Sequence, residues 1–163
     1  MSESGGVSFR LGRSADVESA AELAMLHSGG DRERWLEQFR ADLHTVQRCL
    51  FIAEFQHSVV GYGRTRWFTP ESSAANAPVG FYLLGLVVAP AQRRKGIGGA
   101  LIRARLDWSR QQTAREVWYF TNAANLASQR LHQRYGFREV TRDFSFPGVA
   151  FDGGVGVLSR AYV

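Results

Sequence analysis

Hydrophobic residues along this chain recur at two spacings, which predict a mixture of helices and strands. In residues 14–28 and 31–46 they recur every three or four positions, as on one face of an amphipathic helix. Ser14 and Asp31 stand where the N-caps of these helices are expected. Short apolar stretches bounded by glycine, proline or polar residues predict strands. In chain order, the pattern predicts a strand at 7–11, helices at 14–28 and 31–46, strands at 49–55, 59–68 and 79–88, a helix at 97–112, a strand at 116–122, a helix at 126–135, and strands at 138–146 and 155–162.

The centre of this order determines the fold class. Residues 79–88 are almost all apolar, which is typical of a strand buried on both faces. A helix with an apolar stripe and a second strand follow, so we expect one strand–helix–strand crossover there. The stripe consists of Ile97, Leu101, Ala104 and Trp108. The pattern predicts a mixed α/β (α+β) fold, and 163 residues suit a single domain over 1–163.

Composition narrows the class of protein. A hydrophobic fraction of 45% is enough for a packed core and excludes a wholly disordered chain. Cys49 is the one cysteine, which excludes an internal disulfide and a cysteine-based zinc site. The sequence shows neither a secretory signal nor an apolar stretch long enough to span a bilayer. We therefore expect a soluble cytoplasmic protein that does not act at a membrane.

The charge is distributed unevenly. Residues 1–84 carry 8 Arg and 10 acids, a net charge of −2, whereas residues 85–163 carry 11 Arg, 1 Lys and 5 acids, a net charge of +7. The second half therefore suits an anionic partner, unless its arginines only form solvated surfaces. No helix–turn–helix, RNA-recognition or zinc signature is present, which argues against nucleic acid.

The most informative segment joins the apolar strand at 79–88 to the helix at 97–112. It contains Arg93, Arg94 and Lys95, followed by Gly96 and by the pair Gly98 and Gly99. Free main-chain N–H groups at the start of a helix attract anions, and glycines let phosphate oxygens approach the main chain. The segment matches neither the Walker loop nor the dinucleotide fingerprint.

Two motifs resemble those of the Gcn5-related N-acetyltransferase (GNAT) superfamily. Arg93-x-x-Gly96-x-Gly98 is similar to its acetyl-coenzyme A (acetyl-CoA) signature, Q/R-x-x-G-x-G/A. Residues 125–137 resemble its N-x-x-A-x-x-L-Y-x-x-x-G-F segment, with Ser128 in place of Ala and His132 in place of Tyr. Together the motifs cover the cofactor half of such a fold, about residues 79–140.

The resemblance implies a GNAT-like acyl-CoA N-acyltransferase fold, with a mixed, mostly antiparallel sheet flanked by about four helices. It implies acetyl-CoA as the acyl donor and no metal. Asn125 and Ser128 are expected near the donor's pantetheine end, although Asn125 also suits a helix N-cap. The other implied donor-binding residues are Leu86, Val87 and Val88, through main-chain groups, and Arg93, Arg94, Lys95, Gly96, Ile97, Gly98, Gly99 and Ala100, around the pyrophosphate.

The motifs leave alternatives for the proton-transfer groups. His132 stands where the family commonly has a tyrosine that protonates the departing thiolate, and an imidazolium can donate that proton. The alternatives are that His132 only positions the leaving group or is a surface histidine. Glu54 is the candidate general base, with a solvent-facing strand residue as its alternative reading. Glu71 and a chain of water molecules are further candidates.

The predicted function is transfer of an acetyl group from acetyl-CoA to an amine of a small molecule or peptide. The alternative is a catalytically impaired CoA-binding or regulatory module of the same fold. The negative first half favours a cationic acceptor, and a homodimer is an open alternative to a monomer. Candidate acceptor-pocket residues, each also suited to a core, are Trp35, Trp67, Phe68 and Tyr82.

Overall fold

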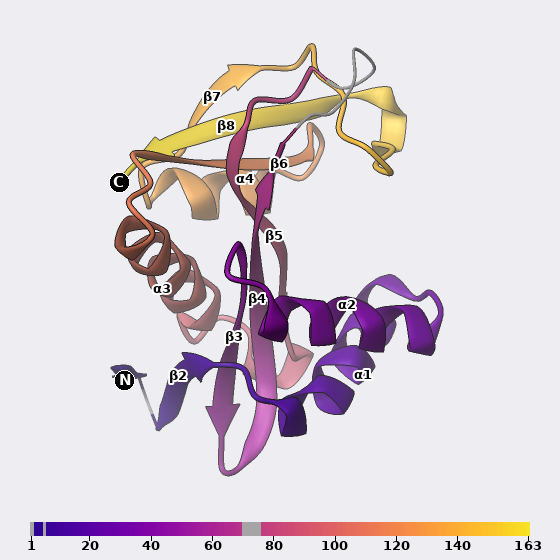
Figure 1. Cartoon of the computed structure of the whole chain (residues 1–163), viewed down its shortest axis with the longest axis vertical. Helices are drawn as coiled ribbons and strands as arrows, with labels where there is room; N and C mark the ends of the chain where they lie inside the picture. Colours follow the sequence, from indigo (N-terminus) through magenta and orange to yellow (C-terminus); the bar gives the residue numbers. More distant parts are fainter. Residues whose placement is uncertain (1, 5, 70–75) are drawn as a thin grey trace. The chain divides into compact units, whose positions relative to one another are not determined.

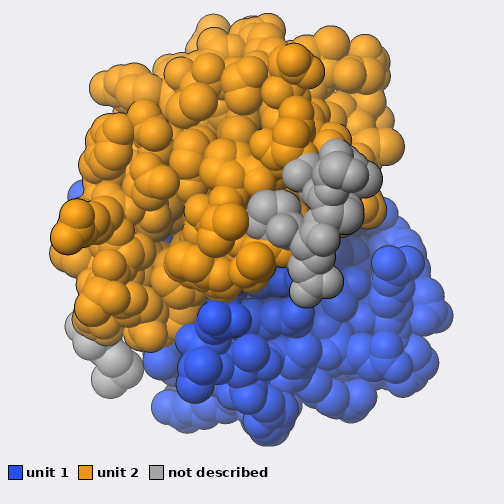
Figure 2. All heavy atoms as spheres, turned by 45° about the horizontal axis from the view of Figure 1, so that its top comes forward, with its two compact units in different colours: residues 1–66, 84–105 blue, residues 67–83, 106–163 orange. Residues whose placement is uncertain are grey.

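The computed structural model describes residues 2–4, 6–69 and 76–163. The chain divides into two compact units, one with residues 1–66 and 84–105 and the other with residues 67–83 and 106–163 (Figure 2). Strands β4 (Ser58–Phe68) and β5 (Gly80–Val88) and helix α3 (Ile97–Gln111) supply residues to both units. A single domain over residues 1–163 stays a prediction.

The first unit is a sheet covered by helices. Its strands follow the order β1-β2-β3-β4-β5. β1 (Ser2–Ser4) pairs antiparallel with β2 (Val7–Leu11), β2 with β3 (Arg48–Phe55), and β3 with β4. Helices α1 (Val17–Ser28) and α2 (Arg32–His44) lie side by side along one face of β3 and β4 (Figure 1). The short helices η1 (Ser14–Asp16) and η2 (Pro90–Gln92) precede α1 and follow β5.

Both faces of the first unit's strands are buried. Leu50 and Ile52 of β3 belong to one hydrophobic cluster with Phe39 of α2 and with residues of α1. Ala53, at the alternate position, belongs to a second cluster with Leu101 of α3. Successive strand residues point to opposite faces, so β3 serves both clusters. The strands are thereby fixed between α1 and α2 on one side and the start of α3 on the other.

The second unit continues from β5. Its strands follow the order β5-β6-β8-β7. Residues 81–83 of β5 pair in parallel with residues 117–119 of β6 (Glu116–Asn122). β8 (Gly156–Tyr162) is antiparallel to both β6 and β7 (Arg138–Thr141). Helix α4 (Leu126–Gln133) follows β6, and the short helix η3 (Asp152–Gly154) precedes β8.

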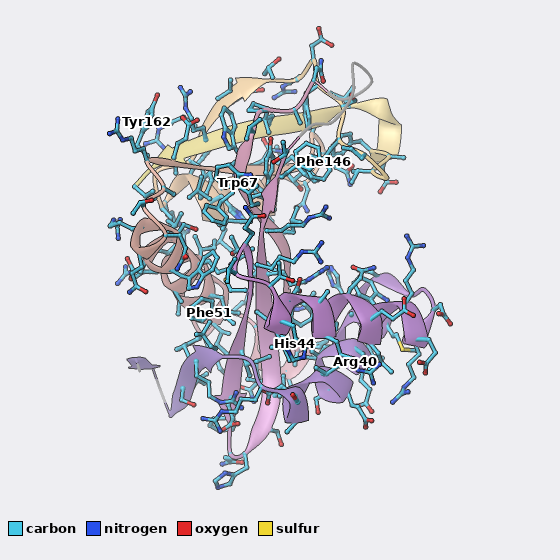
Figure 3. All side chains as sticks on the ribbon, viewed as in Figure 1. Arg40, His44, Phe51, Trp67, Phe146 and Tyr162 are labelled. Carbon is cyan, nitrogen blue, oxygen red and sulfur yellow. The ribbon has the colours of Figure 1, made fainter. Side chains whose placement is uncertain are left out.

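Aromatic side chains form much of the second unit's core, and Figure 3 labels Phe146, which belongs to an aromatic cluster there. The Phe146 ring centroid lies 4.4 Å from that of Phe68, 5.1 Å from that of Tyr82 and 4.7 Å from that of Phe120. Trp67 packs edge-on against a neighbouring phenylalanine. Phe68 and Tyr82 are therefore core residues, as their alternative reading predicted.

The fold class predicted from the pattern is confirmed: the sheet is mixed and mostly antiparallel, and helices α1–α4 were all expected. Strand 116–122 agrees with β6 at both ends. Asp31 is the N-cap of α2, where its carboxylate accepts a hydrogen bond from the Arg34 main-chain N–H. The short strand β1 was not predicted.

Several local predictions were wrong. Ser14 begins η1, and Asp16 occupies the N-cap position of α1. The strand predicted at 138–146 ends at Thr141, because Phe146 instead packs into the aromatic cluster. Beyond Leu83, only Val87 of β5 is buried and Gly85 is exposed, so this part of the strand is not buried on both faces. Of the loop predicted at 69–78, residues 70–75 lie outside the described residues, and so does Glu71.

The buried stripe of α3 also differs from the predicted one. Ile97 and Leu101 are buried as expected, whereas Ala104 and Trp108 are partly exposed. The next buried turn contains Arg105, which has no exposed surface. The sequence analysis assigned no role to this residue.

Candidate active site

The cationic turn between β5 and α3 has the geometry of an anion-binding helix start. Gly96 has φ +79°, a left-handed conformation that favours glycine, and a Cβ built there meets no atom within 4 Å. The first helical hydrogen bond runs from the Ala100 N–H to the Gly96 carbonyl, 3.1 Å. The N–H groups of residues 97–99 therefore precede the hydrogen-bonded part of the helix. They carry the positive end of the helix dipole.

The side chains of the turn add charge and anchorage. Arg93, Arg94 and Lys95 are all exposed. The Arg93 Nε donates to the Val88 carbonyl at 3.2 Å, and the Lys95 Nζ donates to the Gln92 Oε1 at 3.0 Å. Ile97 is 2% exposed and packs into the second hydrophobic cluster. The turn is thus fixed to the strand and to the core while its cations remain on the surface.

Strand β5 leads into this turn and lines two pockets. The smaller, of about 40 Å³, is here called the Arg93 pocket. The larger, of about 220 Å³, is called the Arg64 pocket. Both are lined by Val87 and by His27 at the end of α1. The remaining lining residues are Leu23, Leu26, Val88, Ala89, Pro90 and Arg93 for the first, and Ser28, Trp35, Tyr62, Arg64, Gly85 and Leu86 for the second.

His132 on α4 is a buried residue, so its reading as a surface histidine was wrong. Its side chain is packed: the residue is 2% exposed and the ring stacks on Tyr119, with centroids 3.6 Å apart and planes 7° apart. The Nδ1 atom lies 2.8 Å from the Ser128 carbonyl oxygen. A carbonyl only accepts, so Nδ1 is the donor in this contact.

Asn125 and Ser128 both have structural partners on α4. The Asn125 side chain accepts a hydrogen bond from the Ser128 N–H at 3.1 Å, so Asn125 is the N-cap of the helix. The Ser128 hydroxyl makes a short hydrogen bond with the Tyr119 hydroxyl. Burial raises the pKa of Tyr119, so its hydroxyl stays protonated at neutral pH. A contact of either residue with the donor stays a prediction.

Glu54 forms an ion pair on β3. Its carboxylate accepts a hydrogen bond from Arg10 at 2.7 Å, and Arg10 also makes a two-pronged contact with Asp16 at 2.7 and 2.9 Å. Glu54 lines neither pocket described above. The geometry therefore gives Glu54 a role in joining β2, β3 and the start of α1, while its role as a base stays a prediction.

The predicted site residues fall into two groups. The first unit brings together Leu86, Val87 and Val88 of β5 and the whole cationic turn, and it also holds Glu54. The second unit brings together Asn125, Ser128 and His132 on one short helix.

Sequence reasoning missed His27, Arg64 and Gly85, which line the Arg64 pocket. A signal for Arg64 existed, because an arginine in a strand that also contains Val59, Val60 and Tyr62 needs a partner where it is buried. No local signal could have related it to His27, which lies on a different helix.

The described residues form neither a metal-binding cluster nor a membrane-spanning helix. No group of three or more His, Cys, Asp and Glu side chains able to hold a metal ion occurs within 2–4, 6–69 and 76–163. No helix in these same ranges is long and apolar enough to cross a membrane.

Comparison with solved structures identifies the fold. The chain matches yncA from Salmonella typhimurium, solved with its cofactor acetyl-CoA, with a TM-score of 0.74 at 19% identity, over 97% of this chain and 94% of that one. At this level of identity the match shows a shared fold.

Sequence comparison identifies the family. The aminoglycoside N(6')-acetyltransferase type 1 of Serratia marcescens is 42% identical over 67 residues, 41% of this chain and 45% of that protein. The mycothiol acetyltransferase of Thermobispora bispora is 32% identical across 80% of this chain and 51% of that protein. The chain thus spans about half the length of these curated relatives. The family model described as "Acetyltransferase (GNAT) family" matches residues 16–137, which is most of the chain. This protein therefore belongs to the GNAT acetyltransferase family.

Proposed function

We propose that this protein transfers the acetyl group of acetyl-CoA directly to an amine of a small molecule or peptide. The observation that carries the proposal is the turn after β5, where three exposed cations directly precede the first-turn N–H groups of α3. Family membership supports it, as does the acetyltransferase activity named for the relatives from Serratia marcescens and Thermobispora bispora.

The donor substrate would lie along β5 and the turn. The turn suits its pyrophosphate, because the missing Cβ of Gly96 leaves the main chain accessible. Main-chain groups of Leu86, Val87 and Val88 are the proposed contacts of the pantetheine arm, and an N–H near Val88 is the proposed donor to the thioester carbonyl. The rest of the proposed donor site is Arg93, Arg94, Lys95, Ile97, Gly98, Gly99 and Ala100 on the turn and helix start, with Asn125 and Ser128 on α4.

Acetyl transfer needs two proton movements. The amine nitrogen bonds to the thioester carbonyl carbon and loses a proton, while the carbon–sulfur bond breaks and the thiolate takes up a proton. His132 is the proposed donor of the second proton, from Nε2. For the first, the ion pair of Glu54 with Arg10 favours a chain of water molecules over Glu54 as the acceptor. A cytoplasmic location, the absence of a metal requirement and the oligomeric state stay predictions.

Calorimetric titration with acetyl-CoA tests the donor site. We expect saturable binding, and we expect the double substitution Arg94→Gln/Lys95→Gln to weaken it at least about tenfold, because two charges near the phosphates are lost. Arg110→Gln/Arg115→Gln removes the same charge from exposed positions outside the turn and should leave the Kd unchanged. Absence of binding heat would overturn the proposal. Binding without CoA release in the presence of any amine would instead identify a catalytically impaired CoA-binding module.

A further inference from the structure

The Arg64 pocket offers positive charge and no described negative charge. Within the described part of the chain, its lining contains no carboxylate. Burial raises the pKa of Tyr62 to about 12, so its hydroxyl is neutral at physiological pH. The remaining titratable groups of the lining are Arg64 and His27, which are cationic or neutral.

Arg64 is fixed by hydrogen bonds that use only some of its N–H groups. Its Nε donates to Asp42 at 2.6 Å, and its two terminal nitrogens donate to Gln38 at 3.0 Å and to Asp42 at 3.4 Å. The guanidinium carbon also lies 5.3 Å from the centre of the Phe39 ring. These contacts use three of the five N–H groups of an arginine. The guanidinium is therefore pre-oriented, with two N–H groups remaining for a further acceptor.

Three arginines, Arg48, Arg64 and Arg66, act on the one carboxylate of Asp42. Arg48 lies 4.0 Å from Asp42, and Arg66 stands directly opposite Arg48 across β3 and β4. Like charges at such paired positions are unfavourable. Burial and the charges of Arg48 and Arg64 lower the pKa of Arg66. The Asp42 side chain is 1% exposed, so a ligand in the pocket meets Arg64 and not the carboxylate behind it.

The absence of a side chain at Gly85 leaves space in this pocket, which is nevertheless small. It has φ +48° and is exposed, and a Cβ built there would lie 3.4 Å from the Cδ of Arg64 and 3.6 Å from the Cε2 of Tyr62. The volume of about 220 Å³ is below the roughly 300–1,000 Å³ of pockets for drug-sized ligands. The lining also contains Leu86 and Val87, which belong to the proposed donor site.

We propose that the Arg64 pocket binds the acceptor, and that the acceptor is an amine of amino-acid size that carries a carboxylate. The carboxylate accepts from the two remaining N–H groups of Arg64, and the amine lies toward Leu86 and Val87. This inference rests on the proposed acetyl transfer. Aminoglycosides, which are larger and carry several ammonium groups, do not suit this lining.

The same observations revise the expectation of a cationic acceptor. Four acids of the first half, Glu18, Glu22, Glu33 and Glu37, are exposed on α1 and α2 and line neither pocket. The net negative charge of residues 1–84 therefore does not indicate a negatively charged pocket.

Matched pairs of acceptors test the inference. With the complete chain and saturating acetyl-CoA, CoA release is measured for the standard L-amino acids, for their carboxamides, which keep the amine and lose the carboxylate, and for kanamycin and spermidine. We expect at least one amino acid to be acetylated with a kcat/KM about 30-fold or more above that of its carboxamide, because the pocket's donors are otherwise left unpaired. Kanamycin and spermidine should be poorer acceptors than that amino acid.

Variants of the pocket assign the preference to Arg64. Asp42→Asn/Arg64→Gln removes the ion pair without leaving a lone buried charge, and we expect it to raise KM for the amino acid and to bring the acid-to-amide ratio close to one. Arg64→Lys keeps the positive charge but loses the paired N–H groups of the guanidinium. We expect it to lower the acid-to-amide ratio about fivefold. Arg40→Gln, at an exposed position on α2, is the matched control and should keep the wild-type ratio.

The outcomes separate this inference from the proposed function. Absence of acetyl-CoA binding overturns the proposed function. Binding of acetyl-CoA with equal or faster acetylation of carboxamides, kanamycin or spermidine overturns the inference and leaves acetyl transfer standing. Binding without acetylation of any amino acid also overturns the inference, as does an unchanged acid-to-amide ratio in folded Asp42→Asn/Arg64→Gln protein.

Discussion

The imidazole of His132 is held in one orientation by its own helix and by a stacked ring. The Ser128 carbonyl fixes the hydrogen on Nδ1, and Tyr119 covers the ring face. A tyrosine, the usual residue of the family at this position, has one hydroxyl that both donates and titrates, whereas a histidine separates the two tasks between its nitrogens. The substitution is therefore compatible with proton donation by a different atom.

We predict that His132→Phe keeps the stacking but lowers kcat about 100-fold or more, because the proton donor is lost. The measurement is CoA release across pH 6–9, with an L-amino acid accepted by the wild type. Gln133→Ala, at the next, exposed position of α4, is the control and should retain wild-type kcat. A His132→Phe protein with normal kcat and an unaltered pH profile would show that His132 only packs the helix.

Glu54 and Asp16 both form ion pairs with Arg10. Comparing substitutions of the two acids therefore separates a structural role of Glu54 from a catalytic one. If Glu54 only supports the fold, Glu54→Gln and Asp16→Asn both lower the free energy of unfolding and both retain kcat, which is the result we expect. Urea denaturation and steady-state kinetics measure the two effects. A selective loss of kcat in Glu54→Gln would instead identify Glu54 as the base.

At the scale of elements, Asp16 joins β2 to the start of α1. Its carboxylate accepts from Arg10 and, at 2.7 Å, from the Arg13 main-chain N–H. Burial alone raises the pKa of Asp16, but these hydrogen bonds and charges outweigh it and lower the pKa.

A lowered pKa means that the native state binds fewer protons than the unfolded state as the pH falls. The contribution of Asp16 is therefore complete above its unfolded pKa of about 3.9 and is lost as the pH falls through the lower native value. We predict that Asp16→Asn costs about 2 kcal/mol at pH 7 and that this difference shrinks below pH 4. Urea denaturation at pH 7 and pH 3 measures it; a difference independent of pH would contradict the assignment.

Arg105 ties strands to the helix that crosses them. Its guanidinium donates to the carbonyls of Arg64 on β4, at 2.9 Å, and Leu84 on β5, at 3.2 Å. Gly63 makes this contact possible, because a Cβ there would lie 2.7 Å from the Arg105 Nε. Burial lowers the pKa of Arg105 to about 10, which leaves it charged at neutral pH.

We predict that Arg105→Met destabilises the protein by about 3 kcal/mol, because two partly buried carbonyls lose a charged donor. Arg110→Met, on the exposed face of the same helix, should cost less than about 0.5 kcal/mol. Thermal and urea unfolding of both variants measure the difference. Equal stabilities would show that water replaces the guanidinium.

Elements with strong local signals were predictable, and contacts between distant segments were not. The cationic turn was found from sequence because its glycines, cations and helix start lie within a few residues of one another. Phe146 was assigned to a strand because its packing against Phe68 and Tyr82 depends on residues more than sixty positions away. The Arg64 pocket was missed for the same reason, since α1, α2, β4 and β5 all contribute to it.

At the scale of the whole molecule, the uneven charge of the chain concerns donor binding. The net charge of +5 results from an excess of positive charge in residues 85–163. The exposed cations at 93–95 are part of this excess. Electrostatic attraction of this kind is screened by salt, with a Debye length of about 10 Å at 0.1 M and about 3 Å at 1 M.

We predict that raising NaCl from 50 to 500 mM weakens acetyl-CoA binding about tenfold or less, mainly through the association rate. Stopped-flow mixing at several salt concentrations measures this rate. The Arg94→Gln/Lys95→Gln protein should show a shallower dependence on salt. A rate independent of salt in the wild type would rule out electrostatic attraction as the source of affinity.

The environment of Cys49 has a practical consequence for all of these measurements. The thiol is 4% exposed on β3, and burial raises its pKa to about 12. Sulfhydryl-reactive dyes react with a thiolate, so Cys49 of the folded chain will not react with them at pH 8. An assay that detects free CoA with such a dye therefore has no background signal from the protein. Without substrates, the rate at which the same dye modifies Cys49 then measures how often the interior of the first unit opens to solvent.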